Sequence, residues 1–221
     1  LHLSIRRQRQ MCIRDSLHSK GKESEAGALQ EFYRMLDDTK IMWANQPEPI
    51  GFGDAVLRAE PFVGIEPFLV HAGDTYIISA DHSHLRRIVR LQEELDADGM
   101  FLAKEVRDPR RHGIMMGTRV APGILEVTQV IEKPEHPPTS MGIMPVYVFK
   151  PEIMEALRDL STSKTGEIEL THGIQKIIDE GRKVYALKLM EDEMRLDVGT
   201  PESYWEALNL SYKHLATNPP A

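Results

Sequence analysis

Two aspartates occupy positions where a carboxylate could bind a ligand instead of facing bulk solvent. Asp74 follows Gly73, directly after the continuous apolar run 68–70, and Asp197 stands between two apolar residues just before a Gly-Thr-Pro turn. Two such carboxylates on separate strands could share one hard cation such as Mg²⁺ and leave room for the phosphate oxygens of a substrate. We therefore take Asp74 and Asp197 as candidate metal ligands.

Both aspartates also have a purely structural interpretation. Asp74 could cap the turn that follows it, and its spacing alone gives the two interpretations equal weight. Asp197 could cap the following helix, but Thr200, immediately before Pro201, fits that role better. The metal interpretation is thus stronger for Asp197 than for Asp74.

Two further segments carry groups that could contact a ligand. An apolar strand ends in the adjacent acid and base Glu132 and Lys133, and without other context an exposed charged pair is the preferred interpretation. In the loop 46–56, the glycines would allow a flat ligand to approach closely, and the Gln46 amide could pair with the edge of a base. The alternative for this segment is an ordinary Pro/Gly loop.

Alternating helical and strand patterns from about residue 40 must position these groups. Continuous apolar runs predict strands, and apolar residues at helical spacing predict the helices between them. The strands are expected near 41–44, 68–70, 101–106, 124–131, 142–149 and 183–190, and the helices near 54–60, 82–96, 151–160, 170–178 and 201–215. This alternation predicts an α/β fold, Rossmann-like, with a mostly parallel central sheet flanked by helices. Ligands of such sheets collect outside the carboxyl ends of the strands. Pro145 within 142–149 requires an edge position or a bulge.

Composition excludes several other classes of protein. The chain has 221 residues and a net charge of −7, which argues against a broad nucleic-acid-binding surface. No apolar run approaches the roughly 18 residues that a membrane span needs. The single cysteine, Cys12, excludes a disulfide scaffold, and so little thiol fits a cytoplasmic protein. There is no P-loop, and a partial dinucleotide fingerprint at Gly51 lacks its third glycine.

The first 24 residues differ in composition from the rest of the chain. Residues 1–20 hold five basic residues against one acidic residue, and 1–24 shows no sustained helical or strand period. We expect a disordered or non-native tail over residues 1–24, with a basic arm for an acidic partner as the alternative. The folded domain is expected over residues 25–217.

Seven segments, taken together and in this order, resemble the sugar-phosphate nucleotidyltransferases, also called nucleotide-sugar pyrophosphorylases. The likeness is strongest to the UTP–glucose-1-phosphate uridylyltransferases within that family. The segments are QPEPIGFGDAV (46–56), FLVHAGD (68–74), VRDPRRHGI (106–114), VIEKP (130–134), GIMPVYVF (142–149), GEIELT (166–171) and LDVGTPE (196–202). Each segment alone is a weak signal, whereas the ordered set is a strong one.

The resemblance implies an enzyme and a set of residue roles. An oxygen of a sugar-1-phosphate, most simply glucose-1-phosphate, would attack the α-phosphorus of a nucleoside triphosphate, most simply UTP, and pyrophosphate would leave in line. Mg²⁺ would be held by Asp74 and Asp197, which with Lys133 form the implied catalytic set. Glu132 would bind sugar hydroxyls, and Lys133 would bind the sugar phosphate. The remaining implied substrate-binding positions are Gln46 and Gly51 at the base, Gly73 at the rim and Gly142 under the sugar.

The sequence also departs from the pattern of that family. The first strand and the Gly-rich, Arg-containing phosphate loop have no counterpart in residues 1–30, so we expect an N-terminally incomplete member. His112 and His172 replace a usual Tyr and a usual Asp, which bears on specificity. Two alternatives to UTP-dependent catalysis follow: an inactive nucleotide-sugar-binding fragment or regulatory homologue, and a thymidylyltransferase that uses dTTP. The family also implies a homo-oligomer.

Overall fold

The chain forms two compact units that divide between Ala44 and Asn45. The computed structural model describes residues 2–160 and 166–217. Helix α1 (His2–Ser19) and helix α2 (Glu23–Asp38) make up the regular structure of the first unit. All strands and the remaining helices belong to the second unit, which carries every candidate site residue.

The first unit is a helical hairpin. Gly21 adopts a left-handed conformation (φ +69°) in the turn, where Lys22 N–H donates to Leu17 O over 3.0 Å. Ala26 is buried, at 1% exposure. Helix α1 lies within residues 1–24, for which the sequence predicts a disordered or non-native tail. That expectation rested on periodicity, and α1 carries no continuous apolar stripe that periodicity could detect.

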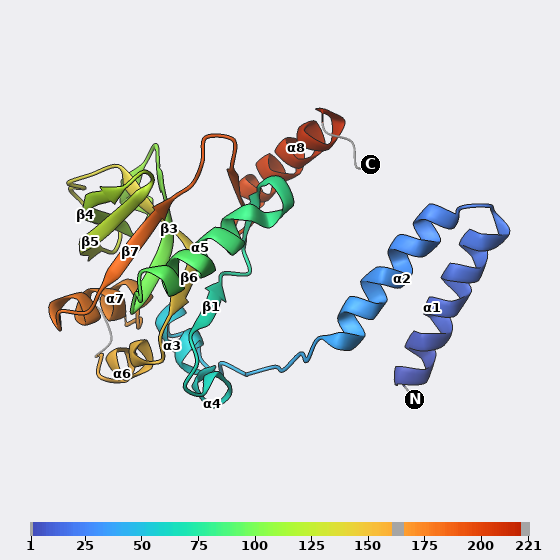
Figure 1. Cartoon of the computed structure of the whole chain (residues 1–221), viewed down its shortest axis with the longest axis horizontal. Coiled ribbons are helices and arrows are strands. Elements are labelled where there is room, and N and C mark those ends of the chain that lie inside the picture. The colour runs from blue at the N-terminus through green and yellow to red at the C-terminus, as the bar shows by residue number, and fades with distance from the viewer. Residues whose placement is uncertain (1, 161–165, 218–221) are drawn as a thin grey trace. The chain divides into compact units, whose positions relative to one another are not determined.

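The second unit is an α/β structure with helices on both faces of a central sheet (Figure 1). Its elements, in chain order, are α3 (Phe52–Leu57), α4 (Glu60–Val63), β1 (Phe68–His71), β2 (Thr75–Ile78), η1 (Ala80–His82), α5 (Ser83–Glu94), β3 (Gly99–Glu105), η2 (Pro109–Arg111), β4 (Ile114–Ala121), β5 (Ile124–Ile131), β6 (Met141–Phe149), α6 (Glu152–Arg158), α7 (Leu170–Asp179), β7 (Val184–Lys188), β8 (Met194–Asp197) and α8 (Pro201–Thr217). The expected α/β class is confirmed.

The expectation of a mostly parallel sheet is wrong. The main sheet has the order β1-β6-β3-β7-β5-β4, and β2 and β8 form a separate two-stranded sheet. Among the described strands, only β3 and β7 pair in parallel, whereas all the other pairs are antiparallel.

Part of the antiparallel pairing comes from a strand that the apolar pattern does not predict. Strand β4 contains Gly117, Thr118 and Arg119, which weaken its apolar pattern, and a two-residue turn at Pro122–Gly123 joins it to β5. Because only a two-residue turn joins β4 to β5, these two strands must pair in antiparallel orientation. Strand β6 in turn runs antiparallel to β1, β3 and β4. The apparent helix–strand alternation therefore broke down in the middle of the chain.

The core lies on both faces of the sheet and follows the two-residue period of the strands. Phe101 and Tyr147 point to the face covered by α6 and α7, whereas Met100 and Val146 point to the face covered by α5. Strands that are covered on both faces account for the continuous apolar runs in the sequence. In the part of the chain that the structure describes, no helix has the length and apolarity to cross a membrane.

Pro145 sits at an irregularity of β6, as its residue type requires. The β3–β6 register shifts between Phe101 and Leu102, opposite Pro145, and β6 lies between β1 and β3 rather than at an edge. The bulge alternative is thus confirmed. Pro145 O accepts a hydrogen bond from Ala72 N–H over 3.0 Å, which ties the end of β1 to the centre of β6.

The loop before α3 packs tightly against the segment before α7. Gly53 N–H donates to Ile168 O over 2.8 Å, and Ile168 N–H donates to Ile50 O over 2.7 Å. Gly51 has a φ of +112°, and a Cβ placed on it would lie 2.5 Å from Ile168 O. Only glycine fits this conformation and this approach.

We predict that Gly51→Ala destabilises the fold by about 3–4 kcal/mol, since it combines backbone strain with overpacking against a backbone oxygen. The matched control is Gly123→Ala, because Gly123 also has a positive φ (+73°) but a Cβ placed on it would have no neighbouring atom within 4 Å. Gly123→Ala should lower the free energy of unfolding by about 1 kcal/mol. Urea denaturation measures both values, and equal costs would contradict the packing argument.

Candidate active site

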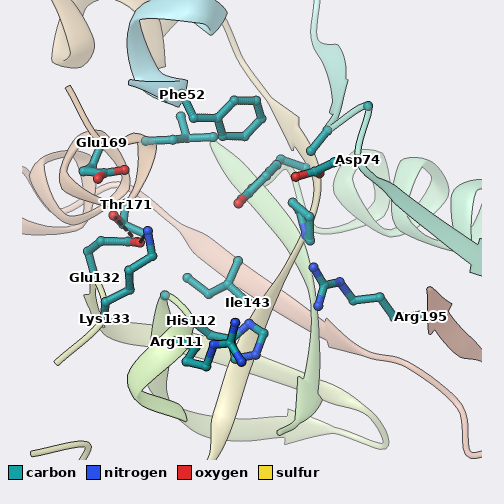
Figure 2. A pocket seen from close by; sticks show the side chains of 16 residues that line it. Phe52, Asp74, Arg111, His112, Glu132, Lys133, Ile143, Glu169, Thr171 and Arg195 are labelled. Carbon is teal, nitrogen blue, oxygen red and sulfur yellow. Dashed lines mark hydrogen bonds and ion pairs between the residues drawn. The ribbon is translucent and has the colours of Figure 1, made fainter. Parts of the chain in front are cut away.

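A pocket of about 420 Å³ opens beside the bulge of β6 (Figure 2). Its walls come from the β1–β2 turn, the start of α3, the approach to β4, the end of β5, β6, the start of α7, and β8. The lining residues are Phe52, Ala72, Gly73, Asp74, Arg111, His112, Gly113, Glu132, Lys133, Ile143, Pro145, Tyr147, Glu169, Leu170, Thr171 and Arg195. Four of the predicted site residues are among them: Gly73, Asp74, Glu132 and Lys133.

The two candidate metal ligands meet at one edge of this pocket. Strands β2 and β8 pair in antiparallel register with Thr75 opposite Asp197, and Val198 N–H donates to Asp74 O over 2.8 Å. A Cβ placed on Gly199 would lie 3.2 Å from Asp74 Oδ2 and 3.5 Å from Asp197 Oδ1. Two carboxylate oxygens thus face the same small space, although Asp197 itself does not line the pocket.

This oxygen pair fits a hard divalent cation that completes its coordination with water and substrate oxygens. Among the described residues, no cluster of three or more His, Cys, Asp or Glu side chains could hold a metal ion. A cation bound by two carboxylates alone fits the space beside Gly199, which a side chain would fill.

Hydrogen bonds fix the orientation of the Asp197 carboxylate and favour its ionised form. Its Oδ2 accepts from Arg195 Nη2 over 2.6 Å, and its Oδ1 accepts from Gly199 N–H over 3.1 Å. Burial raises the pKa of this carboxyl. Hydrogen bonds from Ser203 and Gly199, together with the Arg195 charge, outweigh burial and lower the pKa below its ordinary value. Asp197 is therefore ionised at neutral pH.

Glu132 and Lys133 lie across the pocket from Asp74 (Figure 2). Glu132 Oε2 accepts from Thr171 Oγ1 over 2.9 Å, and Lys133 Nζ lies 3.3 Å from Glu132 Oε1. The Glu132 side chain is only 17% exposed, so the preferred expectation of an exposed charged pair does not hold for it. Burial alone would lower the pKa of Lys133. The charge of Glu132 and its hydrogen bond with Lys133 act in the opposite direction, and the pKa is raised above its ordinary value, so the ammonium keeps its proton.

A second carboxyl group, that of Glu169, lies near Glu132. Burial raises the pKa of Glu169 to about 7, and the Glu132 charge and a hydrogen bond with Glu167 add to this effect. At neutral pH, Glu169 is therefore partly protonated and can both donate and accept a hydrogen bond. The two glutamates offer several acceptors to a polyhydroxylated ligand.

The structure places the other three predicted residues outside the pocket. Gln46 Nε2 donates to Asp54 Oδ2 over 2.8 Å and to Gly51 O over 3.1 Å, while Gly51 packs on the segment before α7. A Cβ on Gly142 would lie 2.7 Å from Val106 Cγ1. Each of the three therefore has a local packing role, and their contacts with substrate stay predictions.

Comparison with known proteins identifies the family. The model of the nucleotidyl transferase family matches residues 5–213. The chain belongs to this family. A UTP–glucose-1-phosphate uridylyltransferase from Pseudomonas aeruginosa is 29% identical over 187 residues, which cover 82% of this chain and 66% of that protein. A glucose-1-phosphate thymidylyltransferase from Streptomyces griseus is 28% identical over 145 residues, which cover 66% of this chain and 39% of that protein.

A solved structure of a UDP-glucose pyrophosphorylase in complex with UDP-glucose has the same fold. It superimposes with a TM-score of 0.79 at 27% identity, covering 86% of this chain and 73% of the other. The present chain spans just under two thirds of the length of the Pseudomonas aeruginosa uridylyltransferase.

Several residues that line this pocket are not among the predicted site residues. Glu169 and Thr171 lie within the segment GEIELT, and Arg111 and His112 lie within VRDPRRHGI. Both segments belong to the family resemblance, but the sequence pattern does not single out these side chains as ligands. Arg195 lies just before the segment LDVGTPE. Its distance of two residues from Asp197 on a strand was the available signal, because such residues share a face.

We predict that Glu169 makes the fold less stable as the pH rises from about 4.5 to 7. With its pKa raised in the folded state, Glu169 keeps its proton where the unfolded chain releases it, so its contribution is present at low pH and is lost as the pH passes 7. The free energy of unfolding of Glu169→Gln, relative to that of wild type, should therefore increase by about 1–2 kcal/mol between pH 5 and pH 8, allowing for solvent screening. Denaturation curves at both values test this, and a pH-independent difference would contradict it.

Proposed function

We propose that this protein transfers a uridylyl group from UTP to glucose-1-phosphate, forming UDP-glucose and pyrophosphate. An oxygen of the sugar phosphate forms a bond to the α-phosphorus of UTP, and the bond between that phosphorus and the oxygen bridging to the β-phosphate breaks. The bridging oxygen leaves with the electron pair as part of pyrophosphate. Such a reaction needs positioning and charge neutralisation more than covalent chemistry by the protein.

The observation that carries this proposal is the convergence of Asp74 and Asp197 at one edge of a polar pocket. These carboxylates would hold Mg²⁺, which when bound supplies charge neutralisation for the phosphates. On the opposite side, Glu132 accepts a hydrogen bond from Thr171 and keeps further acceptor capacity for sugar hydroxyls. Lys133 would bind a phosphate as a point charge.

The loop before α3 would bind the base. Both donors of the Gln46 amide nitrogen are used within the loop, and no hydrogen bond between described residues uses its Oε1. That oxygen could accept from the N3–H of uracil. Thymine carries the same N3–H, so this contact would not distinguish UTP from dTTP. The match to a thymidylyltransferase therefore makes dTTP-dependent transfer the second candidate function.

The test measures pyrophosphate release by this chain from glucose-1-phosphate with UTP or with dTTP, in the presence of Mg²⁺. We expect release with UTP at a higher kcat/KM than with dTTP, and a loss of at least about 100-fold in Asp74→Asn because the charge of one metal ligand is removed. The matched control is Asp179→Asn, an exposed aspartate on α7 outside the pocket, which should stay within about twofold of wild type.

Each contrary outcome identifies a different error. Unchanged turnover in Asp74→Asn would contradict the metal assignment. A higher kcat/KM with dTTP would favour the thymidylyltransferase alternative. Binding of UDP-glucose without any pyrophosphate release would favour a non-catalytic nucleotide-sugar-binding protein.

A further inference from the structure

Arg195 connects the two aspartates to the pocket. It lies on β8 two residues before Asp197, so the two side chains leave the same face of the strand. Its Nη2 donates to Asp197 Oδ2 over 2.6 Å and is 3.4 Å from Thr75 Oγ1. The side chain is 19% exposed and lines the pocket, whereas Asp197 does not.

The guanidinium group has donors that the described protein groups do not satisfy. Arg195 Nε is buried and has no hydrogen-bond partner among the described residues. All hydrogen bonds that its guanidinium makes to these residues come from Nη2. Arginine carries five N–H donors in a planar fork, and leaving a buried charged donor without a partner is costly. An anionic ligand in the pocket could bind to donors that Asp197 and Thr75 leave unused.

We propose that Arg195 is a ligand of the phosphate group of the sugar-1-phosphate and also positions Asp197 for the cation. This inference rests on the proposed function and adds a residue to it. The guanidinium holds Asp197 Oδ2, so that Oδ1 faces Asp74 beside Gly199. With a modest movement of its side chain, it offers Nε and Nη1 to phosphate oxygens in the pocket.

The polarity of the pocket supports this position for the phosphate. In Figure 2, Glu132, Lys133, Thr171 and Glu169 lie on one side, and Asp74 and Arg195 lie on the other. Sugar hydroxyls would bind beside the glutamates, which places the phosphate toward the cation. At the end of the pocket that holds Asp74, Arg195 is the cationic side chain that forms an ion pair with Asp197.

Arg195 lies closer to the two aspartates than the other basic residues of the pocket, and it would act together with Lys133, which the proposed function places at a phosphate. Lys133 Nζ is paired with Glu132 on the sugar side, 3.3 Å from Oε1. Burial lowers the pKa of His112, and the charge of Arg195 lowers it further, so His112 is neutral at pH 7. Arg111 is exposed. Among these groups, Arg195 combines a permanent charge with a position beside both aspartates.

The experiment compares wild type with Arg195→Gln and Arg195→Lys by titration calorimetry and steady-state kinetics. In the presence of Mg²⁺, we expect Arg195→Gln to weaken glucose-1-phosphate binding at least about tenfold and to raise its KM similarly, while the KM for UTP stays within about twofold. Arg195→Lys keeps the charge but loses the fork, so its effect should be intermediate. The control Arg119→Gln removes one exposed positive charge on β4, outside the pocket, and should change neither constant.

A second measurement tests the positioning role without turnover. Mn²⁺ binding, followed by electron paramagnetic resonance, should weaken at least about threefold in Arg195→Gln, because Asp197 loses its orienting partner. Equal glucose-1-phosphate affinity in wild type and Arg195→Gln would overturn the phosphate role. Unchanged Mn²⁺ affinity would overturn the positioning role. Failure of wild type to bind glucose-1-phosphate would overturn the proposed function and the phosphate role with it.

Discussion

The pairing of β2 with β8 is the constraint on which the site depends. Asp74 and Asp197 are far apart in the sequence, and the register that sets Thr75 opposite Asp197 brings their carboxylates to a common point. Each strand has only four residues, and the pair is separate from the main sheet. Its hydrogen bonds alone would not make it stable, because isolated two-stranded sheets are marginal in water.

Burial of apolar side chains and an ion pair at Glu193 hold strands β2 and β8 in place. Ile77 and Leu196 are buried at 1% and 5% exposure, and Ile77 packs in the core beneath α5. Just before β8, the carboxylate of Glu193, itself 2% exposed, accepts from Arg87 of α5 over 2.9 and 3.0 Å. Burial raises the pKa of Glu193, but the hydrogen bond from Arg87 helps to lower it below its ordinary value, so the pair stays charged. A bidentate ion pair of this kind fixes direction as well as distance.

The sequence predicted most of the elements but not how the strands pair. Apolar runs indicated five of the strands, and Pro145 correctly indicated a bulge in β6. The strand expected at 41–44 was wrong, since this apolar run is exposed and has no regular structure. Strand β4 was missed because Gly117 and Arg119 interrupt its apolar pattern, and without that strand the hairpin with β5 could not be seen. The prediction of a parallel sheet was therefore wrong about how the strands are connected. The direction in which two strands pair depends on the segment that joins them and not on their composition.

For the site, the sequence was informative where a residue type stands out against its local context. Asp74 and Asp197 interrupt apolar surroundings next to turns, and the structure does bring them together. Glu169 and Arg195 lack such a contrast, because an acid before a helix and an arginine on a short strand are ordinary surface residues. Their significance comes from partners distant in the chain: Glu132 for Glu169, and Thr75 for Arg195.

The arrangement of charges explains how a protein with a net charge of −7 could bind two polyanions. A basic surface would attract nucleotides without selecting them, since its charges would act at long range. In this pocket, each end instead places a cationic side chain beside a carboxylate: Arg195 is paired with Asp197 at one end, and Lys133 is paired with Glu132 at the other. Glu169, with its raised pKa, limits the negative charge beside Glu132 at the other end. The charges in the pocket are thus paired locally, so polyanions would be bound by individual side chains and a cation, and not by a basic surface.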